Sequence, residues 1–347
     1  MQSIRADVVI VGKGIAGLCL AWLLQQNGID AVLLGRSKPA RALALAETLP
    51  PSALVLLERL GFRALFERSA LKKTLGYHSL WGTADVVDTN FFFHRPFQHG
   101  LKLDKQKLLL ELEKQLARPA VAVDRGFEFH RANKALRFRS ENGFGTVKGK
   151  VFVDATGRSR ALLKAMNVPV WEPDRQLAFS CHLPRIRHPR IKHDVFTELF
   201  GGGWGIVSGL DDETNVMTLF AEKGTSLVRR MRDYTNWKGV LSETRILKAF
   251  LVEGIRAKVI GAVANSSRAE RIAGEGWLAV GDAAIAFDPL SSHGITNAVY
   301  CAWQAESAVA QAIKADASAP LLDYANALEK IFEGYLEVRQ QLRKVNY

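Results

Sequence analysis

The sequence predicts an α/β fold that is interrupted by an inserted α+β domain. An apolar, β-branched run over 7–11 is followed at once by a glycine-rich turn and a helical segment. From about 176 to 260 the pattern changes to consecutive strand-length pieces, and afterwards the strand-and-turn pattern returns over 276–284. The alternation of strands and helices predicts a Rossmann-like parallel sheet, and the interruption predicts the inserted α+β unit.

Length and charge limit the class of protein. At roughly 150 residues per domain, 347 residues correspond to about two structural units. Apolar residues make up 48% and charged residues 24%, which is ordinary for a globular protein. The 47 Lys and Arg residues exceed the 35 Asp and Glu residues by 12, and such an excess bears on partners rather than on fold. An acidic protein, an anionic cofactor, a nucleic acid and a membrane face all remain open at this point.

The cysteines and apolar runs indicate the compartment. Cys19, Cys181 and Cys301 are widely spaced and form no CxxC pair, so neither a disulfide framework nor a metal site is predicted. We expect three buried thiols in a reducing cytoplasm. No apolar run approaches the ~18 residues of a membrane span, and the N-terminal region lacks the small-x-small cleavage site of a signal peptide.

The chain begins with a unit that consists of a strand, a turn, a helix and a second strand. The helical segment that follows the turn extends to Asn27, with Gly28 as its C-cap, and an apolar strand covers 31–34. A unit of this size is typical of a dinucleotide site.

The turn itself carries the pattern GxGxxG. Gly12 permits the tight turn, Gly14 lets a pyrophosphate approach the backbone, and Gly17 lets the helix pack closely on the strand. The helix N-terminus favours negative charge. We therefore assign this turn, with Ile15 and Ala16, to a dinucleotide cofactor.

The remaining elements continue the same pattern. We expect helices over 103–116, 294–315 and 320–343, and strands over 121–123, 134–138, 147–153, 177–183, 204–210, 216–220 and 276–280. We assign 1–75, 97–166 and 262–347 to a discontinuous cofactor-binding domain, and 76–96 and 167–261 to a substrate domain that covers it.

Two further motifs follow later strands, Asp-Ala-Thr-Gly at 154–157 and Gly-Asp-Ala at 281–283. Together with GxGxxG, in this order and spacing, they resemble the FAD-binding triad of the p-hydroxybenzoate-hydroxylase-like flavoprotein superfamily. The resemblance covers nearly the whole chain and implies FAD as the cofactor. It implies that Asp282 accepts a hydrogen bond from the ribitol chain and that the Asp-Ala-Thr-Gly turn lies near the ADP half. The residues that it places at FAD, besides the first turn, are Ala155, Thr156, Gly157, Gly281 and Asp282.

Three shorter segments, 46–53, 174–177 and 288–295, resemble the branch that holds tryptophan halogenases and their relatives. Among these relatives are maturation flavoproteins, which act on the tryptophan of glycine- and lysine-oxidase precursors during quinone-cofactor formation. Their Glu-x-Leu-Pro-Pro and Leu-Ser-Ser-x-Gly-Ile forms match this chain more closely. The resemblance implies an FAD-dependent monooxygenase that hydroxylates an aromatic substrate, specifically a peptidyl tryptophan of a quinone-cofactor oxidase precursor.

The loop before the helix at 294 is the expected catalytic centre. Backbone N–H groups of His293, Gly294 and Ile295 would face the N1/C2=O edge of the flavin and stabilise its negative charge. His293 could move protons, or it could only pack or cap the helix. Ser291 and Ser292 could position the substrate or serve as N-caps.

Further cofactor contacts come from the resemblance. Glu47 and Thr48 would lie along the flavin, where Glu47 could be catalytic or part of a salt bridge, and Pro289 would lie in the same region. The acidic residue that normally holds the adenosine ribose is replaced by Gly35. Ribose recognition then falls to the backbone or to a short basic stretch, with Arg36, Ser37 and Arg41 as candidates.

Two departures weaken halogenation as the activity. Halogenases carry the signature Trp-x-Trp-x-Ile-Pro, but the corresponding residues 204–208 of this chain do not match it. Halogenases also need a lysine, and the position expected for it falls near Tyr77 and His78. The nearby Lys72 and Lys73 are out of register with that position. A flavin-dependent halogenase, a reductase of isoprenoid-type double bonds and a flavin-binding chaperone with little turnover remain as alternatives.

Two tryptophans are candidates for the substrate pocket. Trp81 and Trp204 would line an aromatic pocket or belong to the core.

The charge and the presence of a single GxGxxG indicate which partners to expect. The basic run over 184–193 is either a solvated edge strand or a docking face for an acidic protein substrate. We expect electrons from transient NAD(P)H or from an external flavin reductase. Nucleic acid is disfavoured, since no basic motif is interleaved with aromatic residues.

Overall fold

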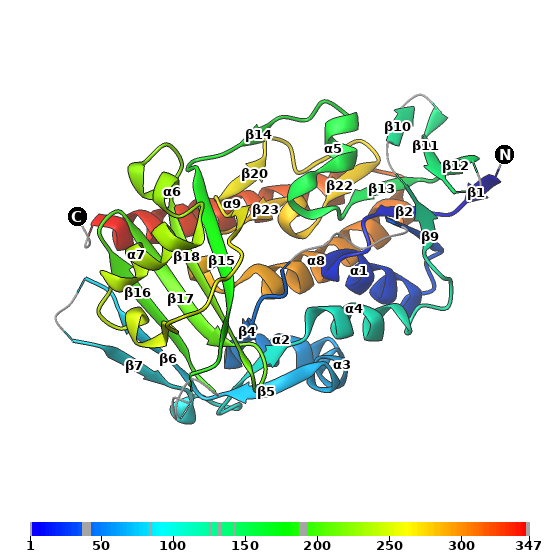
Figure 1. The fold of residues 1–347 in the computed structure, drawn as a ribbon. Coiled ribbons are helices and arrows are strands. Elements are labelled where there is room, and N and C mark those ends of the chain that lie inside the picture. Colours follow the sequence, from blue (N-terminus) through cyan, green and yellow to red (C-terminus); the bar gives the residue numbers. More distant parts are fainter. Residues whose placement is uncertain are drawn as a thin grey trace.

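The computed structural model describes residues 2–36, 43–82, 85–124, 127–130, 133–141, 143–186 and 193–344. Two large sheets lie at opposite ends of the molecule, and the long helices α8 (Gly294–Ala315) and α9 (Ala319–Lys344) extend between them (Figure 1). The fold is mixed α/β, as predicted.

The first large sheet has six strands in the order β21-β22-β13-β2-β3-β9, parallel except for β21. These strands are β2 (Val8–Val11), β3 (Ala31–Arg36), β9 (Val121–Val123), β13 (Val151–Asp154), β21 (Ala273–Gly274) and β22 (Trp277–Ala279). Every residue of β2 and β13 is buried, which is why these runs are apolar without alternation.

Helices cover this sheet and complete its core. They are α1 (Ile15–Gln26), α2 (Pro51–Arg59), α3 (Arg63–Arg68), α4 (Lys105–Glu113) and α5 (Ala161–Ala165), together with α8 and α9. The helix expected over 103–116 is shorter, because Asp104 caps α4 through Lys107 N and the preceding residues form a strand.

The strand expected over 147–153 is wrong as a single element. Val147 belongs to β12 (Gly143–Lys148), which pairs in a different sheet from β13. The break falls at Gly149, where a Cβ would lie 2.7 Å from a Val9 methyl group. Its missing side chain lets the chain pass close to β2 on its way between the two sheets.

The second large sheet has seven strands in the order β19-β15-β18-β17-β16-β6-β7. They are β6 (Gly76–Leu80), β7 (Val87–Asn90), β15 (Gln176–Pro184), β16 (Val195–Phe200), β17 (Gly203–Gly209), β18 (Thr214–Glu222) and β19 (Ile260–Val263). The three strands expected in this region are confirmed as β15, β17 and β18. One face packs on α6 (Ser226–Arg230), α7 (Tyr234–Ser242) and η4 (Leu247–Phe250), and the other faces the loop before α8.

Three smaller sheets connect these parts. The first contains β1 (Gln2–Arg5), β10 (Phe127–His130), β11 (Ala135–Ser140) and β12. The second contains β4 (Glu47–Leu49), β5 (Ala70–Thr74) and β8 (Gly100–Leu103). The third contains β14 (Val170–Trp171), β20 (Ser267–Ala269) and β23 (Ile285–Ala286). Short 3₁₀ turns are η1 (Phe91–Phe93), η3 (Gly157–Ser159), η5 (Gly281–Ala283) and η6 (Pro289–Ser291). The exact domain boundaries stay a prediction.

The three cysteines are buried free thiols, as expected. Within the described ranges, no helix combines the length and the apolar character that crossing a membrane requires. In the same ranges, no group of His, Cys, Asp and Glu side chains is arranged to hold a metal ion.

Candidate flavin site

The glycine-rich turn leaves no room for side chains at two of its positions. Gly12 has φ +120°, and a Cβ there would lie 2.3 Å from the Ala155 carbonyl oxygen. A Cβ on Gly17 would lie 2.0 Å from the Gly12 carbonyl oxygen. At Gly14 the nearest atom to such a Cβ is the Ala155 oxygen at 4.0 Å, so the space before α1 is open.

This open space suits an anionic group. α1 begins at Ile15, and no side chain caps its N-terminus, so the first N–H groups lack a side-chain acceptor. A pyrophosphate there would accept hydrogen bonds from these groups and interact favourably with the helix dipole.

The second motif is shaped by the buried Asp154. Its Oδ1 accepts from Thr156 N at 2.8 Å and from Thr156 Oγ1 at 2.6 Å, and its Oδ2 accepts from Leu163 N at 2.9 Å. The Asp154 carboxylate therefore stabilises the conformation of this turn through its own hydrogen bonds. Gly157 has φ +63°, and a Cβ there would have no atom within 4 Å, so Gly157 lies at the open end of the turn.

The third motif approaches the first. A Cβ on Gly281 would lie 3.0 Å from the Cβ of Ala16, so the Gly-Asp-Ala turn packs directly on α1. The Asp282 side chain is 35% exposed, and Arg158 Nε lies 3.5 Å from its Oδ2. Burial raises the pKa of Asp282, while Arg158 and Lys105 oppose this. Asp282 therefore remains able to accept hydrogen bonds from a polar ligand.

Two arginines that the sequence reasoning did not assign hold these turns together. Arg158 donates to the Phe287 carbonyl oxygen at 2.9 Å. Arg160, which is 3% exposed, donates to the Ala283 carbonyl oxygen at 3.0 Å and to Ser267 Oγ at 2.9 Å. Their place directly after the Asp-Ala-Thr-Gly motif is a sequence signal, but their acceptors are distant in the chain.

Glu47 takes part in an ion pair. Lys105 Nζ lies 3.2 Å from Glu47 Oε1, and Glu47 together with Asp282 raises the pKa of Lys105. Glu47, Lys105 and Asp282 thus form one electrostatic group. The neighbouring Thr48 hydroxyl donates to the Ala46 carbonyl oxygen at 3.1 Å, which ties it to its own strand.

The loop before α8 is built from local hydrogen bonds. Asp288 accepts from Leu290 N at 2.9 Å at the start of η6, whose first residue is Pro289. Ser291 Oγ donates to the Asp288 carbonyl oxygen at 2.9 Å and accepts from His293 N at 3.3 Å. Ser291 therefore shapes the turn, but it is not the N-cap of α8, because that position is His293 and no side chain caps the helix.

The end of this loop is accessible. Ser292 has φ +52°, a left-handed conformation that turns the chain into α8. His293 and Gly294 are exposed, whereas Ile295 is buried, and the His293 side chain makes no capping hydrogen bond. The His293 side chain is thus available to a ligand.

Helix α9 holds the same loop from behind, which the sequence reasoning missed. Arg339 Nε lies 3.3 Å from Asp288 Oδ2, and Arg339 Nη2 lies 3.0 Å from Asp174 Oδ2. The Tyr335 hydroxyl accepts from Asp288 N at 2.9 Å and is 2.7 Å from Ser266 Oγ. The amphipathic pattern of α9 predicts a helix, but it does not identify these polar contacts.

The two candidate tryptophans come together on the second large sheet. Trp204 is stacked on Phe220 with ring centroids 3.9 Å apart, and Trp81 meets Trp204 edge-on at 6.0 Å. Leu290, from the loop before α8, packs on this cluster. Trp204 Nε1 donates to Gln176 at 3.0 Å and is 6% exposed, so Trp204 belongs mainly to the core. Trp81 Nε1 is buried and has no partner.

A neighbouring lysine packs over Gly35, the position at which the sequence comparison expects a ribose-binding acid. A Cβ on Gly35 would lie 2.7 Å from the Cβ of Lys13, whose Nζ is 3.0 Å from Glu113 Oε1. Arg36 ends β3 and is exposed. Ser37 and Arg41 lie outside the described residues, as do 187–192 of the basic run.

Comparison with known proteins identifies the cofactor. Residues 5–162 match the family model of the FAD binding domain. The chain is an FAD-dependent oxidoreductase. The cofactor predicted from the sequence is thereby confirmed as FAD. The open, uncapped start of α1 in this flavoprotein suits a pyrophosphate.

Two related sequences cover almost the whole flavoprotein. The protein LodB of Marinomonas mediterranea, named as an FAD-dependent oxidoreductase, is 24% identical over 346 residues, which are 95% of this chain and 90% of LodB. Digeranylgeranylglycerophospholipid reductase 1 of Methanopyrus kandleri is 27% identical over 356 residues, with 98% of this chain and 90% of the reductase covered.

Solved structures show that the flavoprotein shares the p-hydroxybenzoate-hydroxylase-like fold. The myxobacterial chondrochloren halogenase CndH superposes with a TM-score of 0.83 at 19% identity, covering 99% of this chain and 84% of CndH. The peptidyl tryptophan dihydroxylase QhpG, essential for tryptophylquinone cofactor biogenesis, superposes with a TM-score of 0.73 at 19% identity, covering 99% and 76%.

Proposed function

We propose that this flavoprotein is a monooxygenase that hydroxylates a tryptophan within a polypeptide, during maturation of a quinone-cofactor oxidase. The observation that carries the proposal is the aromatic cluster of Trp81, Trp204 and Phe220, which contacts Leu290 of the loop before α8. Trp204 and Phe220 are almost fully buried, so Trp81, which is partly exposed, is the ring of this cluster that an indole would contact. The fold shared with QhpG, and the relation to LodB, support the same reading.

FAD would supply the redox chemistry, in which one atom of O₂ enters the indole ring, the other leaves as water, and an external reductant provides two electrons. The N-terminus of α1 would hold the pyrophosphate, and Asp282 would accept from the ribitol hydroxyls. The N–H groups of Gly294 and Ile295 would donate to the flavin ring. The exposed His293 would exchange protons with solvent.

The sheet face that carries the aromatic cluster also holds buried polar groups. Tyr77 lies in β6, and Trp81 directly follows this strand, so their even spacing places both on the same face. In the described part of the chain Trp81 Nε1 has no hydrogen-bond partner, and the Tyr77 hydroxyl interacts with Ser292 of the loop before α8. Burial raises the pKa of Tyr77 to about 12, so this phenol stays protonated at neutral pH. The two groups would bind the polar atoms of a peptide that presents its tryptophan here.

The test is a reconstitution. The FAD-loaded protein is mixed with NADH, a flavin reductase and a tryptophan-containing precursor of a quinoprotein oxidase, and the tryptic tryptophan peptide is weighed by mass spectrometry. A gain of one or two oxygen atoms is expected. A precursor with phenylalanine in place of the tryptophan, and the variant Asp282→Ala, serve as controls. If the tryptophan peptide gains no oxygen under any reducing system, the proposed function is wrong.

A second candidate is reduction of isoprenoid-type double bonds, which the relation to the archaeal reductase favours. That activity needs a long apolar channel. The cavity beside β7 does not supply such a channel by itself, because its lining includes the charged or titratable residues Lys73, His78, Asp88, His99 and Asp194. A geranylgeranyl lipid in the same assay would gain two hydrogen atoms if this candidate were correct, and added bromide would test halogenation.

A further inference from the structure

We propose that the cavity beside β7 is a docking site for an acidic, partly apolar segment of the polypeptide substrate, separate from the flavin site. This inference rests on the proposed function, because it assumes that the substrate is a polypeptide. The cavity has a volume of about 590 Å³ and lies between the segment that joins β5 to β6, the strand β7, and residues 98–99.

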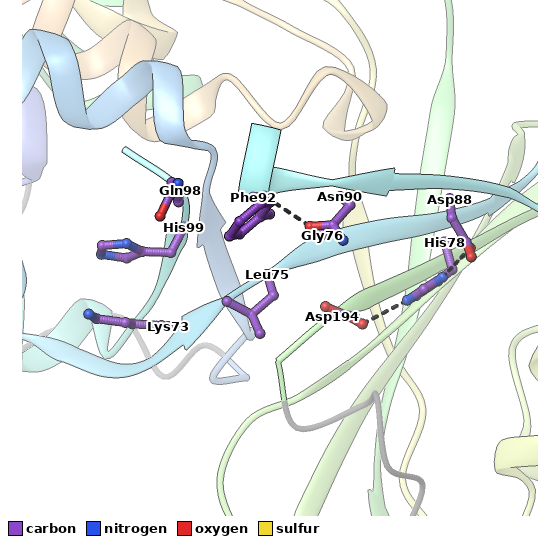
Figure 2. Close-up of a pocket in the computed structure, with 10 residues that line it drawn as sticks. All are labelled: Lys73, Leu75, Gly76, His78, Asp88, Asn90, Phe92, Gln98, His99 and Asp194. Carbon is purple, nitrogen blue, oxygen red and sulfur yellow. Dashed lines mark hydrogen bonds and ion pairs between the residues drawn. The ribbon is translucent and has the colours of Figure 1, made fainter. Parts of the chain in front are cut away.

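The cavity has two chemically different ends. Figure 2 shows Lys73 and His99 at one end, and Asp194, His78 and Asp88 at the other. Such a division suits a ligand that carries both charged and neutral polar groups, as a peptide does.

At the second end, one carboxylate oxygen has no partner. His78 Nε2 lies 2.7 Å from Asp194 Oδ2, and His78 Nδ1 contacts Asp88 Oδ1. Asp194 is 8% exposed, and its Oδ1 makes no hydrogen bond. In Figure 2 this oxygen points away from His78, on the side of Leu75. A buried acceptor without a donor costs free energy, and a peptide N–H would lower that cost if it displaced the groups that cover this oxygen.

At the first end, cations dominate. Lys73 lies next to His99, and burial together with Lys73 lowers the pKa of His99. The His193 ring lies 3.1 Å from the Lys73 carbonyl oxygen, which brings the end of the basic run to the rim of the cavity. Arg95 donates to the Phe92 carbonyl oxygen at 3.2 Å and adds a further positive charge near the entrance. These charges, with the net excess of 12, favour an acidic partner.

Leu75 and Phe92 line the cavity between its two ends, and Phe93 follows Phe92 in the chain. Leu75 is 47% exposed, Phe92 58% and Phe93 79%. The two phenylalanine rings meet edge-on at 5.5 Å, which fixes them as one projecting surface. Exposed aromatic side chains next to a cavity mark an interaction site, because covering them removes apolar area from water.

An extended peptide fits better than a small molecule because of β7. It is the last strand of the seven-stranded sheet as described, and all four of its residues are exposed. An edge strand presents backbone N–H and C=O groups along its outer side, and an extended segment can pair with them.

The position of Tyr77 relates this cavity to the flavin site. Gly76 and His78 line the cavity, and the Tyr77 ring between them lies on the opposite face of β6. It packs edge-on against Phe91 at 5.0 Å, and its hydroxyl group interacts with Ser292 of the catalytic loop, which opposes the effect of burial on its pKa. A segment bound in the cavity is therefore separated from the catalytic loop by one strand, and it would hold the substrate while the tryptophan reaches the flavin.

The experiment measures binding apart from turnover. The probe is a fluorescein-labelled peptide of three Glu-Leu-Trp-Glu repeats, titrated with FAD-loaded protein and followed by fluorescence anisotropy, beside a peptide with lysine in place of glutamate. We expect the acidic peptide to bind at least tenfold more tightly than the basic one, with an affinity that falls as salt is added. Lys73→Glu and Phe92→Ser should each weaken binding at least fivefold, and the matched exposed variant Lys330→Glu less than twofold.

The outcomes separate this inference from the proposed function. Far-UV circular dichroism and FAD content establish that each variant is folded. Equal binding by the wild type and by both folded cavity variants overturns the docking site, whether or not tryptophan is oxidised. Binding that depends on Lys73 and Phe92 supports the docking site, even if the oxygenation assay shows that the proposed reaction is wrong.

Discussion

Arg339 of α9 lies between two buried carboxylates, 3.0 Å from Asp174 Oδ2 and 3.3 Å from Asp288 Oδ2. Asp174 lies two residues before β15 of the seven-stranded sheet, whereas Asp288 caps η6 at the start of the loop before α8. The ion pair between Arg339 and Asp288 therefore fixes the candidate catalytic loop relative to the sheet that would hold the substrate.

Replacing Arg339 by methionine should leave both carboxylates buried without a counter-charge. Loss of one partner of a buried ion pair typically costs about 3–5 kcal/mol. We expect a fall of this size in the free energy of unfolding, measured by urea titration, together with weaker FAD binding. Arg229→Met, at an exposed position, should change stability by about 0.5 kcal/mol or less. An Arg339→Met protein with unchanged stability and FAD affinity would show that the contact does not position the loop.

Gly14 and Gly17 should respond differently to alanine. The Cβ of Gly17→Ala would lie 2.0 Å from a backbone oxygen, so we expect a marked loss of thermal stability. A Cβ at Gly14 meets no protein atom closer than 4.0 Å, so Gly14→Ala should remain folded. Since the new methyl group would occupy the space expected for the pyrophosphate, FAD affinity should fall at least tenfold, about 1.4 kcal/mol. Thermal melts of the apoprotein and FAD titrations distinguish the two effects. Unchanged FAD affinity in Gly14→Ala would contradict the assignment of this turn.

The buried Lys102 should make stability depend on pH. Burial lowers the pKa of Lys102 to about 7, whereas an unfolded lysine titrates near 10.4. Between these values the unfolded chain holds a proton that the folded chain has released, so the free energy of unfolding rises with pH. The contribution is at most about 1.4 kcal/mol per pH unit.

Urea unfolding between pH 7 and 8.5 measures this effect. The window stops there because burial raises the pKa of the Cys181 thiol to about 12, and this acts in the opposite direction at higher pH. Lys102→Met should remove most of the rise, although it also removes the hydrogen bond to the Asp194 carbonyl oxygen at 3.0 Å. The slope, not the absolute stability, is therefore the readout. A Lys102→Met protein with the wild-type slope would refute the pKa assignment.

Glu47 should act through its ion pair with Lys105 rather than in catalysis. The pair is partly exposed, and such pairs are worth about 1 kcal/mol or less. We expect Glu47→Gln and Lys105→Met each to reduce the rate of oxygen transfer less than threefold. The double variant should resemble either single variant, because both remove the same contact. A hundredfold loss in Glu47→Gln alone would instead assign a catalytic role to this carboxylate.

The core strands and the cofactor turn were predictable because their signals are local. The runs that form β2, β3 and β13 are continuously apolar, and the steric needs of Gly12 and Gly17 involve neighbouring backbone. The strands β6, β7 and β16 were not predicted. Strands β7 and β16 each have one neighbour that is close in the chain, but the pairing of β6 with β16, such as Val195 with Tyr77, joins residues more than a hundred positions apart, and no local period reveals it.

The role of Gly35 shows the same limit. The sequence shows that the usual ribose-binding acid is absent, but only the structure shows Lys13 packed over the vacant position. Likewise, the sequence places Asp288 in the loop before α8, whereas its partners Tyr335 and Arg339 come from the last helix.

By itself, the sequence determined the fold class, the FAD motifs and the positive charge, since each depends on residue type and short spacing. Only the tertiary structure decided which side chains meet: Glu47 with Lys105, Trp81 with Trp204, and Lys73 with His99 at the end of the cavity opposite to Asp194. The physical reason is that hydrogen bonds, ion pairs and cavities depend on distances of a few ångströms between residues far apart in the chain, and these distances follow from how the sheets and helices pack.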